Sequence, residues 1–163
     1  MKYTIKFFTM VLGVMFLFTA CGPGEGNEPT PAELQLERLV GDYKASSSKS
    51  WTVSEVLFDG SENRTADWTG FTITMSTTGT ISGTHSYTTT GGLAGGPWPG
   101  SGSWEFGGTV DNPNINKIIR DDGLEIAITV NDSQLTMTFI FDNNIHTSGR
   151  IEAVNGEYSF TFN

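Results

Sequence analysis

The sequence alternates between apolar and polar residues in several separate segments, and this period of two restricts the fold more than any other feature. It is clearest in the runs GFTITMS, LEIAITV, LTMTFIF and EYSFTF, at residues 70–76, 124–130, 135–141 and 157–162. Such alternation is typical of β-strands that bury one face and expose the other. Shorter or weaker strands are expected at 41–47, 51–58, 80–89, 102–107, 115–119 and 147–154.

Turn-forming sequences separate these strands. They include DGSEN, STTG, RDDG, NDS and VNG, which are rich in residues that favour tight turns. Strands joined in this way predict an all-β fold, an antiparallel up-and-down meander. With about eight to ten strands, closure into a barrel removes the exposed strand edges. A β-sandwich is the alternative.

One short helix is expected before the first strand. Thr30, Pro31 and Glu33 form a capping-box start, and Gly41 suits the helix end. From Leu34 onward about 130 residues remain, enough for one domain with a single core. Several large residues would fill much of an eight-stranded barrel, namely Trp104, Met137, Phe139, Phe141, Phe160 and Phe162.

The first 20 residues have the order of an export signal. Lys2 and Lys6 precede an apolar run, Phe7–Ala20, that is too short to remain as a membrane span. With Cys21 directly after two small residues, the segment resembles a bacterial lipoprotein signal. This resemblance implies cleavage before Cys21 and a diacylglyceryl group on its sulfur. An ordinary secretory signal with an incidental cysteine is the alternative.

The lipoprotein resemblance implies three parts: a signal peptide (1–20), a lipidated tether (21–31) and a barrel domain (32–163). It implies a protein of the cell envelope, anchored in the outer membrane through the lipid on Cys21. Glu25 and Glu28 follow the cysteine without being adjacent, so surface display and periplasmic residence both stay open. Because the chain has only one cysteine, no internal disulfide is expected.

Longer segments carry a second resemblance. The runs PWPGSGSWEF, NKIIRDDGLEIAI, SQLTMTFIF and SGRIEAVNGEYSFTF resemble lipocalin-like (calycin-type) lipoproteins of Bacteroidota, over most of residues 36–163. The run LVGDYKASS is similar to the first strand of a lipocalin, where a short helix precedes Gly-x-Trp; here the triplet is Gly41-Asp42-Tyr43. The resemblance implies a lipocalin-like barrel with structural roles for Gly41, Tyr43 and Arg150, in which Arg150 packs over the Tyr43 ring.

Charge and the scarcity of reactive side chains argue against several classes of function. Removal of residues 1–20 leaves 7 Lys and Arg against 18 Asp and Glu, a formal charge of −11, which argues against nucleic-acid binding. Only two histidines are present, and no zinc spacing, EF-hand loop or Gly-x-Ser-x-Gly motif is found. We therefore expect no enzyme activity, no metal and no cofactor.

One strand and the loop after it carry the candidate ligand-binding residues. In TISGTHSYT, the alternation places Ile81, His85 and Tyr87 on one side, and a glycine-rich loop with Trp98 between two prolines follows. Loops at a barrel mouth often line a site. His85 and Tyr87 are thus expected to orient a ligand that Trp98 covers. Alternatively, the histidine is hydrogen-bonded at the edge of the core and the tryptophan caps the barrel end.

Two functions follow from this sequence. The first is a non-catalytic, membrane-anchored barrel that binds a small apolar or amphipathic ligand at its mouth. The second is a cell-surface interaction protein with a side-chain-filled barrel that contacts a protein partner or a glycan. The lipocalin resemblance favours the first function, and the many large aromatic residues favour the second.

Overall fold

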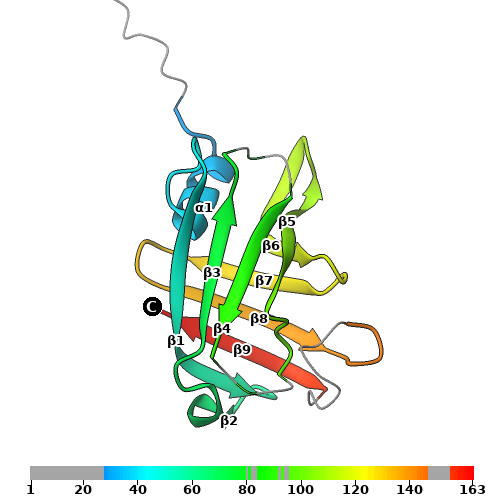
Figure 1. Cartoon of the computed structure of the whole chain (residues 1–163). Coiled ribbons are helices and arrows are strands. Elements are labelled where there is room, and N and C mark those ends of the chain that lie inside the picture. Colours follow the sequence, from blue (N-terminus) through cyan, green and yellow to red (C-terminus); the bar gives the residue numbers. More distant parts are fainter. Residues whose placement is uncertain (1–27, 80, 82–83, 92, 94–95, 147–154) are drawn as a thin grey trace, which may run out of the picture.

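The computed structural model describes residues 28–79, 81, 84–91, 93, 96–146 and 155–163. These residues form one antiparallel sheet and a short helix that precedes it (Figure 1). The helices are α1 (Pro31–Val40) and the 3₁₀ helix η1 (Thr65–Trp68). The strands are β1 (Ser47–Phe58), β2 (Glu62–Asn63), β3 (Thr72–Thr77), β4 (His85–Thr90), β5 (Ser101–Thr109), β6 (Asn112–Arg120), β7 (Glu125–Val130), β8 (Leu135–Phe141) and β9 (Gly156–Phe162).

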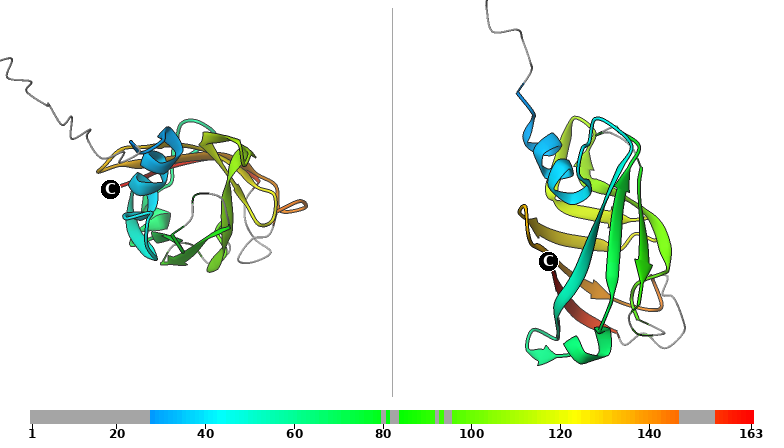
Figure 2. Two further views of the ribbon diagram at one scale, coloured as in Figure 1. Left: turned by 90° about the horizontal axis from the view of Figure 1, so that it is seen from above. Right: turned by 60° about the vertical axis from the view of Figure 1, so that its left-hand side comes forward.

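The sheet closes on itself. Its strand order is β2-β1-β3-β4-β5-β6-β7-β8-β9, and β1 also pairs with β9 from Val53 opposite Phe162 to Phe58 opposite Tyr158. All strands except β2 therefore form a ring, which is seen from above in Figure 2. This closure confirms the predicted meander barrel, and the β-sandwich alternative is wrong.

Helix α1 lies across part of one barrel end (Figure 2). The capping box is confirmed: the Glu33 N–H donates to Thr30 Oγ1 at 3.3 Å, and the Thr30 N–H donates to Glu33 Oε2 at 2.6 Å. The helix ends at Gly41, whose φ of +90° suits glycine and whose N–H donates to the Glu37 carbonyl at 2.8 Å. Leu36 and Leu39 are buried, so the helix covers this end of the core.

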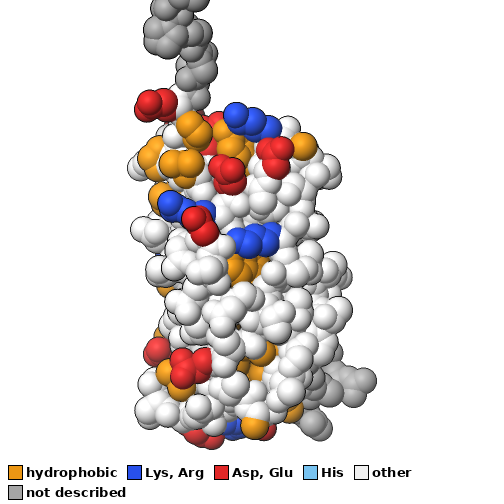
Figure 3. Space-filling view, turned by 90° about the vertical axis from the view of Figure 1, so that its left-hand side faces the viewer, with side chains coloured by type: hydrophobic (Ala, Val, Ile, Leu, Met, Phe, Trp, Pro, Cys, Tyr) orange, Lys and Arg blue, Asp and Glu red, His pale blue; other side chains and the backbone are white. Residues whose placement is uncertain are grey.

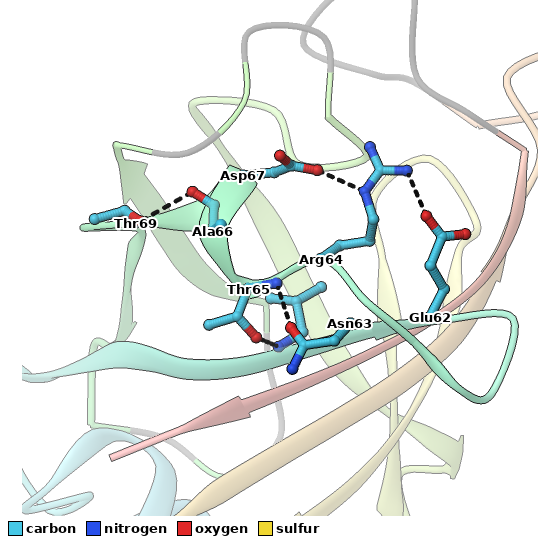
Figure 4. A network of polar contacts seen from close by, with 8 residues as sticks. Glu62, Asn63, Arg64, Thr65, Ala66, Asp67 and Thr69 are labelled. Carbon is cyan, nitrogen blue, oxygen red and sulfur yellow. Dashed lines mark hydrogen bonds and ion pairs between the residues drawn. The ribbon is translucent and has the colours of Figure 1, made fainter.

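The opposite barrel end carries β2 and η1 (Figure 1). Figure 4 shows that Arg64 holds this turn together, with Nε 2.5 Å from Asp67 Oδ2 and Nη1 3.3 Å from Glu62 Oε1. The turn delivers Trp68 into the core, where its ring centroid lies 4.7 Å from that of Phe160. This end of the barrel is thus closed by an aromatic side chain.

The strand bounds differ from the expected ones at the start of the barrel. Separate strands at 41–47 and 51–58 are wrong, because one long strand, β1, covers 47–58, and residues 41–46 form a turn. In that turn the Asp42 carboxylate accepts the Lys44 N–H at 2.9 Å, which stabilises a bend. The strand expected at 80–89 is β4, which covers 85–90. The strand expected at 147–154, and Arg150 within it, lie outside the described residues.

Candidate functional site

The barrel interior is filled by side chains of its own strands. The six large residues expected to fill it are all buried: Trp104, Met137, Phe139, Phe141, Phe160 and Phe162. A small space remains between the residues Ile73, Met75, Tyr87, Trp98, Trp104, Ile118, Arg120 and Ile126, and it has no room for a water molecule. This part of the interior does not admit a ligand in this conformation.

Trp98 contributes to this filling. It lies in the loop between β4 and β5 and is only 7% exposed. Its ring centroid lies 5.5 Å from that of Phe139, 5.9 Å from Tyr87 and 6.1 Å from Phe160. All three of these ring pairs are edge-to-face, a favourable aromatic geometry. The packing of Trp98 matches the alternative in which this residue caps the barrel end.

A buried ion pair fixes the loop that carries Trp98. Arg120, at the end of β6, binds Asp122 through Nε at 2.8 Å and Nη2 at 2.5 Å, and both side chains are buried. Its Nη1 donates to the Pro97 carbonyl at 2.7 Å, and the guanidinium carbon lies 5.6 Å from the Trp98 ring centroid. This arginine is not among the site residues expected from the sequence, because RDDG predicts only a turn.

His85 and Tyr87 point into the barrel, as the alternation predicts, and each is 2% exposed. His85 Nδ1 lies 3.1 Å from Thr77 Oγ1, and its ring packs on Trp104 with 4.4 Å between centroids. Burial lowers the pKa of His85 and raises the pKa of Tyr87 to about 12. Both side chains are therefore neutral at pH 7.

The structure brings Tyr87 and Trp98 into contact, whereas His85 packs further along β4 on Trp104. Within the described residues, three buried polar atoms of this group make no hydrogen bond: His85 Nε2, Tyr87 Oη and Trp98 Nε1. The Tyr87 hydroxyl lies over Gly102, where a Cβ would come within 2.6 Å of it. A ligand-binding role for these three residues stays a prediction.

An open groove lies at the barrel end that carries α1. This helix-end groove has a volume of about 730 Å³ and runs between the start of α1 and the β5–β6 hairpin. It is lined by Thr30, Pro31, Ala32, Ile81, Glu105, Phe106, Gly108, Thr109, Val110, Asp111, Asn112, Pro113 and Ile115. Val110 is 78% exposed at the hairpin tip. Phe106 packs edge-on against Trp104 at 5.6 Å, so the groove wall continues into the core.

The groove has a mixed polar and apolar lining with an acidic margin. Its apolar walls come mainly from Ile81, Phe106, Val110, Pro113 and Ile115. Its charged members are Glu105 and Asp111, and no Lys or Arg is among the described residues that line it. A lining that combines apolar side chains, polar groups and two carboxylates suits an amphipathic molecule whose polar part is neutral or cationic.

The helix-end groove is not predictable from the local sequence. The run DNPNIN predicts only a turn, yet β6 begins at Asn112 and the hairpin wall includes Pro113 and Ile115. The signal that could have found it is Val110, an apolar residue within a polar turn sequence. A single exposed valine is too common to identify a site. The groove depends on α1 lying beside a distant hairpin.

Tyr43 is buried near the end of α1, and its structural role stays a prediction. Its expected contact with Arg150 lies outside the described residues. A comparable aromatic–cation pair occurs nearby: Trp51 Nε1 donates to the Leu39 carbonyl at 3.0 Å, and Lys49 Nζ lies 3.8 Å from the Trp51 ring centroid. This pair attaches β1 to α1 beside the groove-bearing end.

Comparisons of the chain with protein-family models, curated proteins and solved structures found no match. In the part of the chain that the structure describes, none of the helices has the length and apolar character needed to cross a bilayer. Those same residues bring together no group of three or more His, Cys, Asp or Glu side chains able to hold a metal ion. The function is therefore argued from geometry.

Proposed function

We propose that this protein is a lipid-anchored β-barrel of the cell envelope that binds a small apolar or amphipathic ligand in the helix-end groove. The observation that carries the proposal is the groove itself, with a volume of about 730 Å³. This volume lies within the roughly 300–1,000 Å³ usual for small-molecule sites. The proposed role is binding without catalysis.

The position of the proposed anchor supports an amphipathic ligand. Thr30 and Pro31 line the groove, and Cys21, the proposed lipidated residue, lies nine positions before Thr30. Nine residues span at most about 30 Å when fully extended. A lipid on Cys21 would therefore keep the groove close to the membrane surface, where amphipathic molecules are concentrated.

The acidic margin narrows the ligand class. Glu105 and Asp111 would repel the carboxylate of a fatty acid, whereas a neutral headgroup can accept or donate hydrogen bonds there. We therefore expect a neutral amphiphile, such as a monoacylglycerol, to bind more tightly than a fatty acid of the same chain length.

The filled interior supports the second candidate function, an interaction protein that contacts a protein partner or a glycan. Its support is that the space among the core side chains has no room for a ligand. The two candidates predict different results for the groove, because an interaction protein has no need to bind an amphiphile there.

Photo-crosslinking of the full chain in lipid nanodiscs tests the groove. We expect saturable labelling by a diazirine-bearing monoacylglycerol, mapped by mass spectrometry to the β5–β6 hairpin and the start of α1. Val110→Glu should lower this labelling about tenfold, since it places a charge on the apolar wall. Labelling that does not saturate, or that spreads evenly over the barrel, would contradict the groove proposal.

Ile140→Glu is the matched control. Ile140 is an apolar residue that is 69% exposed, close to the 78% of Val110, but it lies on β8 and does not line the groove. This variant should label as the parent does. An equal loss in both variants would indicate a general effect of added charge.

A further inference from the structure

The chain contains one Asn-Gly sequence, Asn155-Gly156. Asn155 is exposed and lies directly before β9, whose first residue is Gly156. Asparagine followed by glycine is the dipeptide most prone to deamidation, because glycine has no side chain to keep its backbone nitrogen away from the asparagine amide. The surroundings of the pair determine whether this reaction can proceed in the folded protein.

The fold requires glycine at position 156. Gly156 has a φ of +154°, a backbone conformation that other residues rarely adopt, and a Cβ there would come within 2.5 Å of the Phe58 ring. A Cβ would also lie 2.9 Å from Asp59 Oδ1, in the turn between β1 and β2. The packing of β9 against the end of β1 therefore leaves the nitrogen that follows Asn155 without a shielding side chain.

Two hydrogen bonds hold the side-chain amide of Asn155. Its Oδ1 accepts the backbone N–H of Asn143 at 2.8 Å, and its Nδ2 donates to Asp142 Oδ1 at 3.2 Å. When a nucleophile attacks the side-chain carbonyl carbon of Asn155, negative charge develops on Oδ1. An N–H group that already points at this oxygen stabilises the charge. The Asn143 N–H thus lowers the barrier to attack on Asn155.

We propose that Asn155 is a deamidation site in the folded protein. The backbone nitrogen of Gly156 attacks Cγ of Asn155, so that a bond forms between these two atoms and the bond from Cγ to Nδ2 breaks. The proton of the Gly156 nitrogen leaves with Nδ2 as ammonia, and a cyclic succinimide remains. Water then adds to either carbonyl of the succinimide and opens the ring to aspartate or isoaspartate.

Both products place a carboxylate where the neutral amide was. Asp142 is ionised at neutral pH, because hydrogen bonds from the backbone and side chain of Asn144 hold its pKa below the ordinary value. The new carboxylate therefore repels Asp142 instead of donating to it. Figure 3 shows acidic side chains at the lower end of the barrel, the end that carries β2, so the charge is added to an acidic region. Deamidation should thus weaken the contact between the end of β8 and the start of β9.

The deamidation site is separate from the helix-end groove. The groove lining includes neither Asn155 nor Gly156, and Gly156 lies against Phe58 and Asp59 rather than against α1. This inference therefore goes beyond the proposed function and does not depend on it. Deamidated protein should label with the monoacylglycerol probe as the parent does, so failure of one proposal is distinguishable from failure of the other.

Mass spectrometry of the full chain in nanodiscs tests the proposal. The protein would be incubated at pH 8.5 in water labelled with oxygen-18, so that the water that opens the succinimide marks each product formed during the incubation. We expect Asn155 to convert to labelled aspartate and isoaspartate at a rate within about tenfold of that of a free peptide of residues 151–160. At pH 6.5 the rate should be at least tenfold lower, because attack requires a deprotonated backbone nitrogen.

Asn144 is the internal control. It is also exposed and its amide also donates to Asp142, but it precedes Ile145, whose branched side chain shields the backbone nitrogen. Asn155→Gln is the control variant: its longer side chain would have to close a larger ring, so position 155 should gain no label. The proposal is overturned if Asn155 converts more than about tenfold more slowly than the free peptide, or no faster than Asn144.

Asn155→Asp tests the structural consequence, because it carries the charge of the products without the reaction. This variant should melt a few degrees below the parent, since it loses the hydrogen bond to Asp142 and gains a repulsion. The difference should shrink at 1 M salt, where the Debye length is about 3 Å. A melting temperature equal to that of the parent would overturn the proposed weakening of the contact between β8 and β9.

Discussion

At the scale of single residues, the effect of removing Trp98 shows whether this residue belongs to the core or forms a lid over a ligand. It packs against Phe139, Phe160 and Tyr87, and Arg120 holds the preceding proline. We expect Trp98→Ala to lower the free energy of unfolding by about 3–5 kcal/mol, the usual cost of deleting a buried aromatic side chain. Urea denaturation measures this change.

Leu93→Ala provides the control for Trp98. Leu93 belongs to the same loop but is 43% exposed, so its loss should change the free energy of unfolding by about 0.5 kcal/mol or less. If Trp98→Ala instead leaves stability intact, and the parent binds a fluorescent fatty acid that the variant does not bind, then Trp98 is a lid, and its predicted binding role with His85 and Tyr87 holds.

His85 links stability to pH. Burial lowers its folded-state pKa below the ordinary value of about 6.5. As the pH falls, His85 of the unfolded chain thus binds a proton at a higher pH than His85 of the folded chain. The contribution of neutral His85 to the free energy of unfolding is therefore complete above pH 6.5 and is lost as the pH falls towards the folded-state pKa. In that interval we expect His85 to lower the free energy of unfolding by at most about 1.4 kcal/mol for each pH unit that the pH falls.

Urea denaturation of the parent and of His85→Gln between pH 7.5 and 5 tests this linkage. The variant has no titrating group at this position, so its stability should fall less steeply below pH 6.5. Equal slopes in the two proteins would show that His85 is protonated as readily in the folded state as in the unfolded state, against its burial beside Trp104.

At the scale of elements, the alternating pattern predicts the strands that form regular pairs. The runs at 124–130 and 135–141 correspond closely to β7 and β8, because each buries one face and meets its neighbour through a short turn. The start of β1 was harder to predict, because residues 47–50 are Ser, Ser, Lys and Ser. Their strand conformation comes from pairing with β3, which is not visible in local sequence.

The candidate sites also differ in how far the sequence predicts them. The inward direction of His85 and Tyr87 follows from strand alternation and was predictable from their spacing. The helix-end groove joins α1 to the β5–β6 hairpin, some 75 residues further along the chain. Only the closed barrel brings these residues together.

At the scale of the whole molecule, barrel closure gives the protein three different surfaces. The inside is apolar and filled, the end beside α1 carries the groove, and the outer face of β1, β3, β4 and β5 carries hydroxyl groups. If Cys21 is lipidated, the chain enters the barrel at the groove end, since α1 begins at Pro31. The groove would then be near the membrane.

The anchor itself gives the last prediction. Each methylene of a buried acyl chain contributes about 0.8 kcal/mol, and more than one chain anchors a protein stably. The parent should therefore partition into the detergent phase of a Triton X-114 extraction, and the mass of its N-terminal peptide should include a diacylglyceryl group on Cys21. Cys21→Ser removes the sulfur that carries the lipid, so this variant should move to the aqueous phase with an unchanged melting temperature. Detergent partitioning as strong as that of the parent would refute the anchor, and with it the placement of the groove beside the membrane.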